Sequence, residues 1–156
     1  MDNTFQKIGV INYKQSKYAT LFIMGSFIFF VFIGAVLIVL SGSVDSNILL
    51  GCLCHFVLHE TIHLIFMKLF SKESLYLSIK FPTISVGSKG KFSKLQFTII
   101  ALAPVTILGA VLILLLVCCP RGYTFILAII LTLNFAGAGG DYLQVFEMRK
   151  YSADTF

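Results

Sequence analysis

Long apolar stretches alternate with short polar ones along this chain. Each of the four apolar stretches is about as long as the roughly 20 residues that a membrane-spanning helix requires. They cover residues 20–40, 48–70, 97–119 and 123–146. The pattern therefore predicts an all-α polytopic membrane protein with about four transmembrane helices.

The apolar stretches divide the chain into three parts. Residues 1–19 form a polar leader, residues 20–150 a single membrane-embedded domain, and residues 151–156 a short tail. The first stretch is too long for the apolar core of a signal peptide, and no small-residue cleavage site follows it. We therefore expect it to remain in the protein as a span.

A different periodicity occurs between the second and third spans. Four apolar residues alternate there with more polar ones: Leu75, Leu77, Ile79 and Phe81. This is the period of a half-buried strand, and Pro82, which cannot donate to a sheet ladder, favours an edge or a break. We expect a short cytoplasmic β-hairpin or strand segment, which either binds a substrate as an added strand or caps the helices.

Composition and charge agree with a membrane location. Hydrophobic residues make up 58% of the chain and charged residues 12%, and the mean hydropathy is +0.94. Basic residues precede the first span, occur in residues 68–94 around the end of the second, and follow the fourth, whereas the opposite loops hold only Arg121. This is the positive-inside pattern, so we expect both termini to be cytoplasmic.

The net charge of +5 does not indicate a nucleic-acid partner. Lysines that set the topology and contact anionic lipid explain it without one. The expected partners are the lipid bilayer and a membrane protein or peptide substrate, with no nucleic acid.

One turn of the second span carries a metal-binding motif. Residues 59–63 read His-Glu-Thr-Ile-His, so His59 and His63 lie one helical turn apart on one face. This spacing lets two imidazoles bind one Zn²⁺, and Glu60 beside them is placed to act as a base toward water on the metal. Ionisable groups are costly at membrane depth and usually mark a functional site. The motif therefore predicts an intramembrane zinc metalloprotease.

Two histidines leave a catalytic zinc without its usual third protein ligand. The candidates are His55, Asp141 and Asp45, of which Asp45 falls in an outer loop. The histidine pair is centred about seven residues before Lys68, and Asp141 lies eight before Arg149. At a rise of 1.5 Å per residue, both lie about 10–12 Å below the cytoplasmic interface. We expect Asp141 to be the third ligand, the alternative being a carboxylate that only hydrogen-bonds its neighbours.

Other polar or helix-breaking residues lie near this site. His55, one turn before His59, is a further metal ligand, a residue that orients a ligand, or part of a polar cavity lining. Asn134 makes either an interhelical hydrogen bond or a substrate contact. The glycines between Asn134 and Asp141 allow close helix approach or local unwinding, and Pro104 is expected to kink the third span.

The chain resembles the site-2-protease-like intramembrane zinc metalloproteases and, within that class, the small bacterial zincin peptidase family. The resemblance covers about residues 48–150 and rests on the motif at 59–63, on Ala103-Pro104, and on Asn134 followed by a glycine-rich run into Asp141. The class has a proline between the asparagine and the aspartate and a glycine after it; this chain lacks the proline and has Tyr142 instead. These departures leave the role of Asn134 open.

The resemblance implies a function and a ligand set. One zinc ion per chain would be held by His59, His63 and Asp141, with Glu60 as the catalytic base. The reaction implied is hydrolysis of a membrane-embedded or membrane-proximal peptide near the cytoplasmic face of a bacterial cytoplasmic membrane.

Three other functions would use the same residues. These are a metal transporter or sensor, an enzyme that acts on a lipid or other small molecule, and a non-catalytic interaction protein that retains a zinc site. Transport requires ligands spread along a path, whereas here the expected ligands lie at one depth.

Overall fold

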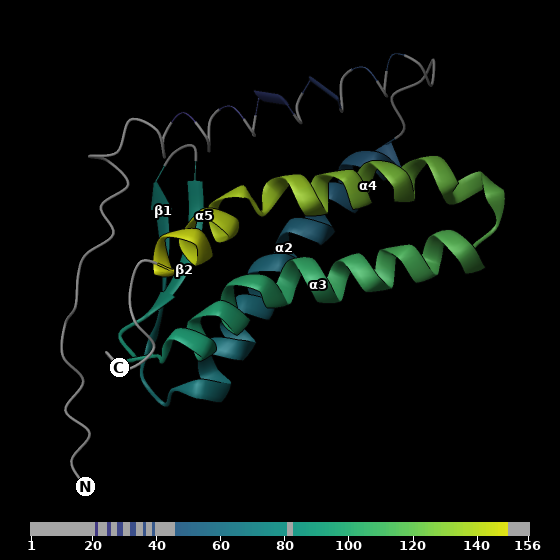
Figure 1. Cartoon of the computed structure of the whole chain (residues 1–156). Helices are drawn as coiled ribbons and strands as arrows, with labels where there is room; N and C mark the ends of the chain where they lie inside the picture. Colours follow the sequence, from purple (N-terminus) through teal and green to yellow (C-terminus); the bar gives the residue numbers. More distant parts are fainter. Residues whose placement is uncertain are drawn as a thin grey trace, which may run out of the picture.

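The computed structural model describes residues 46–80 and 83–149, together with eight isolated helical positions between residues 21 and 39. In chain order the elements are α2 (Ser46–Phe70), β1 (Leu75–Lys80), β2 (Thr83–Ser88), α3 (Lys94–Cys118), η1 (Arg121–Tyr123), α4 (Thr124–Gly137) and α5 (Gly139–Met148). The predicted fold class is confirmed: long apolar helices with one two-stranded antiparallel sheet between α2 and α3 (Figure 1). Apart from the isolated positions, the span predicted at 20–40 lies outside the described residues, as do Asp45 and Phe81.

Three helical segments of the described chain are long and apolar enough to cross a membrane. They are Ile48–Phe70, Lys94–Cys118 and Arg121–Met148, close to the second, third and fourth predicted spans. Large apolar side chains on their outer surfaces are exposed, for example Leu53 and Val57 on α2. Exposed apolar surface of this extent is unfavourable in contact with water and favourable in contact with lipid. The chain is therefore an integral membrane protein.

Helix α3 holds the described helices together. It packs against α2, α4 and α5, and α2 and α4 also pack against each other. Its buried positions include Ala101, Ala103 and Gly109, small residues that let helix backbones approach closely in a membrane. A β-carbon at Gly109 would lie 3.2 Å from Nδ2 of Asn134, so the glycine makes room for that side chain of α4.

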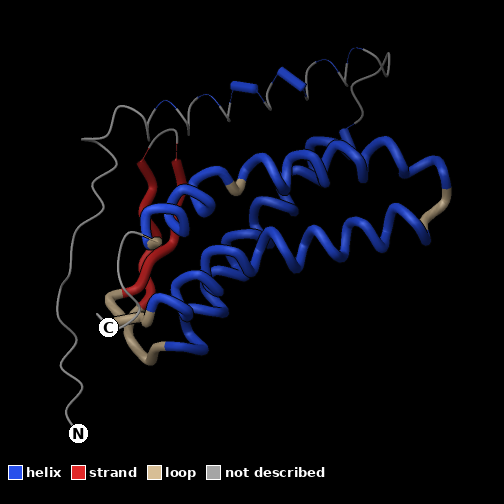
Figure 2. Tube along the Cα trace, viewed as in Figure 1, coloured by secondary structure: helices blue, strands red, loops and turns tan. Residues whose placement is uncertain are grey.

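The chain between α2 and α3 forms a hairpin at one end of the helices, opposite the connection between α3 and α4 (Figure 2). Leu77 pairs with Val86. Just beyond the strands, the N–H of Lys89 donates to the carbonyl of Ser74 at 3.4 Å, so residues 74 and 89 form a hydrogen-bonded pair of the same ladder. Hydrogen-bonded and non-bonded pairs alternate along an antiparallel ladder. The backbone groups of residues 75, 77 and 79 therefore face the outer edge of β1, and those of 84, 86 and 88 the outer edge of β2.

A capping box starts α3 directly after the hairpin. The Ser93 hydroxyl accepts from the Gln96 N–H at 3.2 Å, and the Gln96 side chain accepts from the Ser93 N–H at 2.9 Å. These bonds satisfy donors that a helix N-terminus otherwise leaves free. The start of α3, and with it the register of α3 beside α2, is thereby defined.

The last span is interrupted between α4 and α5. Ala138 separates the two helices with ψ at 9°, which takes one residue out of the regular helical conformation (Figure 2). A β-carbon on Gly137 or Gly140 would meet nothing within 4 Å, so close packing does not explain these glycines. Of the two alternatives for the glycine-rich run, local interruption of the helix is observed. As a result, Asp141 lies in the first turn of α5, where the helix dipole favours a negative charge.

Candidate metal centre

Helix α2 presents two imidazoles on one buried face. The ring centroids of His59 and His63 are 5.0 Å apart, and both side chains are buried. Thr61 lies between them in sequence but is exposed, and its hydroxyl donates to the Val57 carbonyl of its own helix at 2.7 Å. The helical repeat thus separates the buried face of α2 that carries the two imidazoles from its exposed, apolar side.

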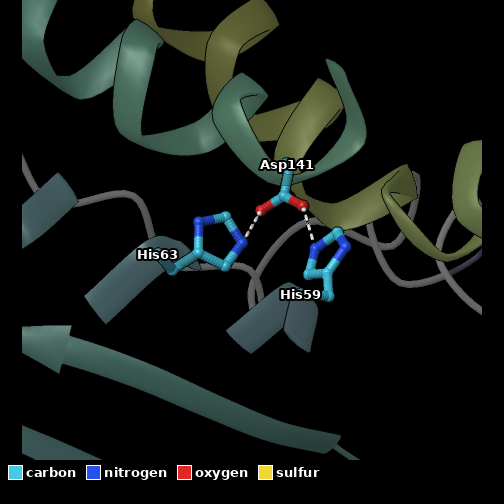
Figure 3. A group of neighbouring side chains, drawn as sticks. All are labelled: His59, His63 and Asp141. Carbon is cyan, nitrogen blue, oxygen red and sulfur yellow. Dashed lines mark hydrogen bonds and ion pairs between the residues drawn. The ribbon is translucent and has the colours of Figure 1, made fainter. Parts of the chain in front are cut away.

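Asp141 lies between the two imidazoles (Figure 3). Its Oδ2 is 3.2 Å from Nε2 of His59, and its Oδ1 is 3.4 Å from Nε2 of His63. The three side chains come from α2 and α5, and one ligand atom from each lies within 4.8 Å of the other two. Among the described residues, this is the group of histidine, cysteine and carboxylate side chains that has the geometry to hold a metal ion.

The donor spacing suits zinc. One donor atom from each of the three residues lies within 4.8 Å of the other two, which brings all three within reach of one ion that binds its donors at about 2.0–2.2 Å. Two histidines and one carboxylate are also a known ligand set of catalytic zinc sites, in which the fourth position stays open. The donor types and their spacing both fit this ion.

A backbone carbonyl determines which nitrogen of His63 is available as a ligand. Nδ1 of His63 is 2.9 Å from the carbonyl oxygen of Ile100 in α3. A carbonyl only accepts, so Nδ1 carries the proton and Nε2 of the neutral ring has a free lone pair. That lone pair faces the Oδ1 atom of Asp141, also an acceptor, and a cation between the two atoms makes the arrangement favourable.

Glu60 lies beside the histidine pair and contacts the hairpin. The backbone N–H of Val86 in β2 lies close to its carboxylate and interacts with it. Val86 is one of the residues whose backbone groups face away from β1, so this interaction costs the hairpin no ladder contact. Glu60 is not in the group of ligand atoms, which leaves its carboxylate free to act on a substrate or water.

The other two predicted site residues lie outside this group. The ring of His55 is half-buried, with its centroid 6.2 Å from that of His59. Asn134 is fully buried, and its Nδ2 donates to the Val105 carbonyl of α3 at 2.9 Å. This is the interhelical hydrogen bond expected as one alternative for Asn134. Its Oδ1 has no hydrogen-bond partner in the described part of the chain.

Two backbone groups of the site were not predicted from the sequence. They are the carbonyl of Ile100, which orients His63, and the N–H of Val86, which contacts Glu60. Backbone groups carry no residue signature, so a motif search does not find them. The one available signal was Pro104, because a proline has no N–H for the carbonyl four residues earlier in a helix.

The comparisons with known proteins agree with this geometry. A family model described as "Putative zincin peptidase" matches residues 52–156, which include the whole of the candidate metal centre. No curated protein and no solved structure matches the chain.

Proposed function

The chain belongs to the zincin peptidase family, and from this premise we propose that it is an intramembrane zinc metalloprotease. It would hydrolyse a peptide bond of a membrane-embedded or membrane-proximal substrate near the cytoplasmic face. The observation that carries the proposal is the position of Asp141 between His59 and His63, with Glu60 alongside, within apolar helices.

His59, His63 and Asp141 would hold the ion, one per chain. When bound, zinc supplies a Lewis acid that polarises the substrate carbonyl and lowers the pKa of water toward about 7. The ligands are held from both sides, since α2 supplies the imidazoles and α5 the carboxylate. The Ile100 carbonyl fixes the orientation of His63.

Glu60 would act as the catalytic base. It accepts a proton from water as the water oxygen attacks the peptide carbonyl, and it then delivers this proton to the leaving nitrogen as the C–N bond breaks. The Val86 N–H, which lies close to the carboxylate, would help to position it.

The arrangement supports proteolysis more than metal transport. Transport requires successive ligand groups along a path through the membrane, whereas the described residues bring candidate ligands together at one position. A non-catalytic zinc protein would not require a carboxylate that lies beside the ligand group and yet outside it, as Glu60 does.

Membrane vesicles of known orientation test the activity and its sidedness together. The lysines around the end of α2 and beyond it favour a cytoplasmic hairpin and cytoplasm-facing site. A panel of tagged single-span membrane proteins would be co-expressed with the chain. Cleavage would be detected as a smaller tagged fragment on a denaturing gel. Membrane-permeant phenanthroline should stop cleavage in every vesicle, and added Zn²⁺ should restore it. Membrane-impermeant EDTA should stop it in inside-out vesicles and spare right-side-out ones.

The two chelators separate the possible failures. Cleavage that survives phenanthroline would contradict a metal-dependent protease. Cleavage stopped by EDTA in right-side-out vesicles instead would leave the protease in place and reverse its orientation.

The substrate would be held extended, as an added strand on the hairpin. The sequence pattern named residues 75–81 for this role, but β2 lies between β1 and Glu60. The position of Glu60 beside Val86 favours the outer edge of β2, because the Val86 N–H faces the carboxylate and a peptide paired with the outward groups of residue 84 would lie next to it. The outer edge of β1 is farther away by about one strand spacing of 4.8 Å.

Two proline substitutions distinguish the edges. Ile84→Pro removes one outward N–H from β2, Leu77→Pro removes one from β1, and neither position donates to the ladder. We expect Ile84→Pro to slow cleavage about 2–10-fold, the effect of one lost backbone hydrogen bond to substrate. Leu77→Pro should leave the rate unchanged, and both variants should keep their zinc. Slowing by Leu77→Pro alone would assign the substrate to β1, and no effect of either would make the hairpin purely structural.

A further inference from the structure

The carbonyl that orients His63 is one that its own helix cannot use. In an α-helix the carbonyl of residue 100 accepts from the N–H of residue 104. Residue 104 of α3 is Pro104, which has no N–H, and the helix nevertheless continues through it to Cys118. The Ile100 carbonyl accepts instead from Nδ1 of His63 at 2.9 Å.

Burial makes this partnership exclusive. Ile100 is 4% exposed, Pro104 is less than 2% exposed, and the His63 side chain is buried against them. Water is therefore excluded from the carbonyl, and an unpaired polar group at membrane depth is costly. A proline ring inside a helix also crowds the carbonyl four residues earlier, which disfavours the ordinary helical position of that carbonyl. Both effects direct the carbonyl to His63.

We propose that Pro104 is a positioning residue for the metal centre, acting through the Ile100 carbonyl. By withholding an N–H from that carbonyl, it reserves the acceptor for Nδ1 of His63 and so keeps Nε2 deprotonated and directed at Asp141. This inference rests on the proposed zinc function and extends it to a residue that touches neither ion nor substrate.

A second polar contact of α3, made with α4, shows what is particular to the contact with α2. Asn134 donates to the Val105 carbonyl, which has an ordinary helical donor four residues later in Gly109. That carbonyl is shared between two donors. The Ile100 carbonyl, in contrast, has no helical donor because residue 104 is a proline. It is the carbonyl that accepts from the site histidine His63.

Pro104→Ala tests the inference, because it returns an N–H to residue 104 and lets the helix compete for the carbonyl. We expect zinc affinity, measured by competition with a chromogenic chelator, to fall about 2–10-fold, because the carbonyl is then shared between two donors, as the Val105 carbonyl is, and the orienting hydrogen bond is weakened. Thermal stability of the metal-free protein should be unchanged or higher, since a helix gains a bond when an internal proline is removed. A purely structural proline would give the opposite pattern, a lower stability with unchanged affinity.

A second variant isolates the missing N–H from the ring. Pro104→lactic acid, introduced as a backbone ester, lacks both the ring and the N–H. It differs from Pro104→Ala in the missing donor and in a weaker acceptor at the carbonyl of Ala103, which receives a hydrogen bond from Thr106. It should retain wild-type zinc affinity and a wild-type visible spectrum with Co²⁺ in place of zinc. Val105→Ala, which truncates the neighbouring buried residue without changing the N–H at 104, controls for packing.

The outcomes separate this inference from the proposed function. Equal affinity in wild type and Pro104→Ala, or equal losses in the alanine and ester variants, would overturn the role of Pro104 and leave the zinc site standing. A wild-type protein that binds no zinc would overturn both.

Discussion

Glu60→Gln is expected to lower the rate of peptide cleavage by about 10²–10⁴-fold while leaving zinc content at the wild-type value. General acid–base catalysis contributes an acceleration of this size, and a glutamine cannot accept the proton of the attacking water. Its amide keeps the length of the side chain, and its oxygen can still accept from the nearby Val86 N–H. The measurement pairs initial cleavage rates in proteoliposomes with metal analysis of the same preparations.

A control variant lies one residue away. Thr61→Ala changes the opposite, lipid-exposed side of α2 and removes only a hydrogen bond within the helix. It should cleave at the wild-type rate. Wild-type cleavage by Glu60→Gln would assign the base to another residue, and zinc loss in this variant would make Glu60 a ligand.

The membrane fold could be predicted because each of its elements depends on the residues of one continuous segment. Each span needs only about 20 apolar residues, whatever its neighbours, so the bounds of α2 and α3 follow from composition. The hairpin follows from a period of two and Pro82 in the same way. The equal depth of the histidine pair and Asp141 followed from the constant rise of a helix, which converts residue counts into distances.

The remaining features depend on how the helices rotate and pack. Asn134 contacts the Val105 carbonyl because Gly109 leaves room for it, a relation between two helices that neither sequence contains alone. Likewise, β2 rather than β1 lies next to Glu60, although the alternation is longer in β1. The sequence predicted a kink at Pro104, which concerns only the shape of the helix. Its chemical consequence, a free carbonyl at Ile100, needed the position of His63 as well.

The interruption before Asp141 connects the fold to the site. A continuous α4–α5 helix would place Asp141 in mid-helix, where no free backbone donors lie near its carboxylate. The turn at Ala138 makes Asp141 the third residue of a new helix, so the dipole at that N-terminus stabilises its charged form. A charged carboxylate is the form that binds a metal ion. The interruption in the glycine-rich run therefore places Asp141 where its proposed role as a ligand is favoured by backbone geometry.

Asp141→Ala is expected to reduce zinc from about one ion per chain to a small fraction of that value, with complete loss of cleavage. Two ligands from one turn of α2 would remain, and a catalytic zinc site needs three. The loss of affinity should exceed the 10–100-fold that a missing orienting group costs. Asp141→Asn, which keeps the size but removes the charge, should show the same direction of change. Metal analysis after size-exclusion chromatography gives the stoichiometry, and the elution profile shows whether each variant is folded.

His55→Ala is the matched comparison for Asp141. His55 lies one turn before His59, but its ring is outside the group formed by His59, His63 and Asp141. We therefore expect His55→Ala to keep its full complement of zinc while Asp141→Ala loses it. The reverse result would remove Asp141 from the ligand set and make His55 the third ligand. In that case the ligands would all come from α2, and Asp141 would only hydrogen-bond the imidazoles from α5, at the distances that the structure gives.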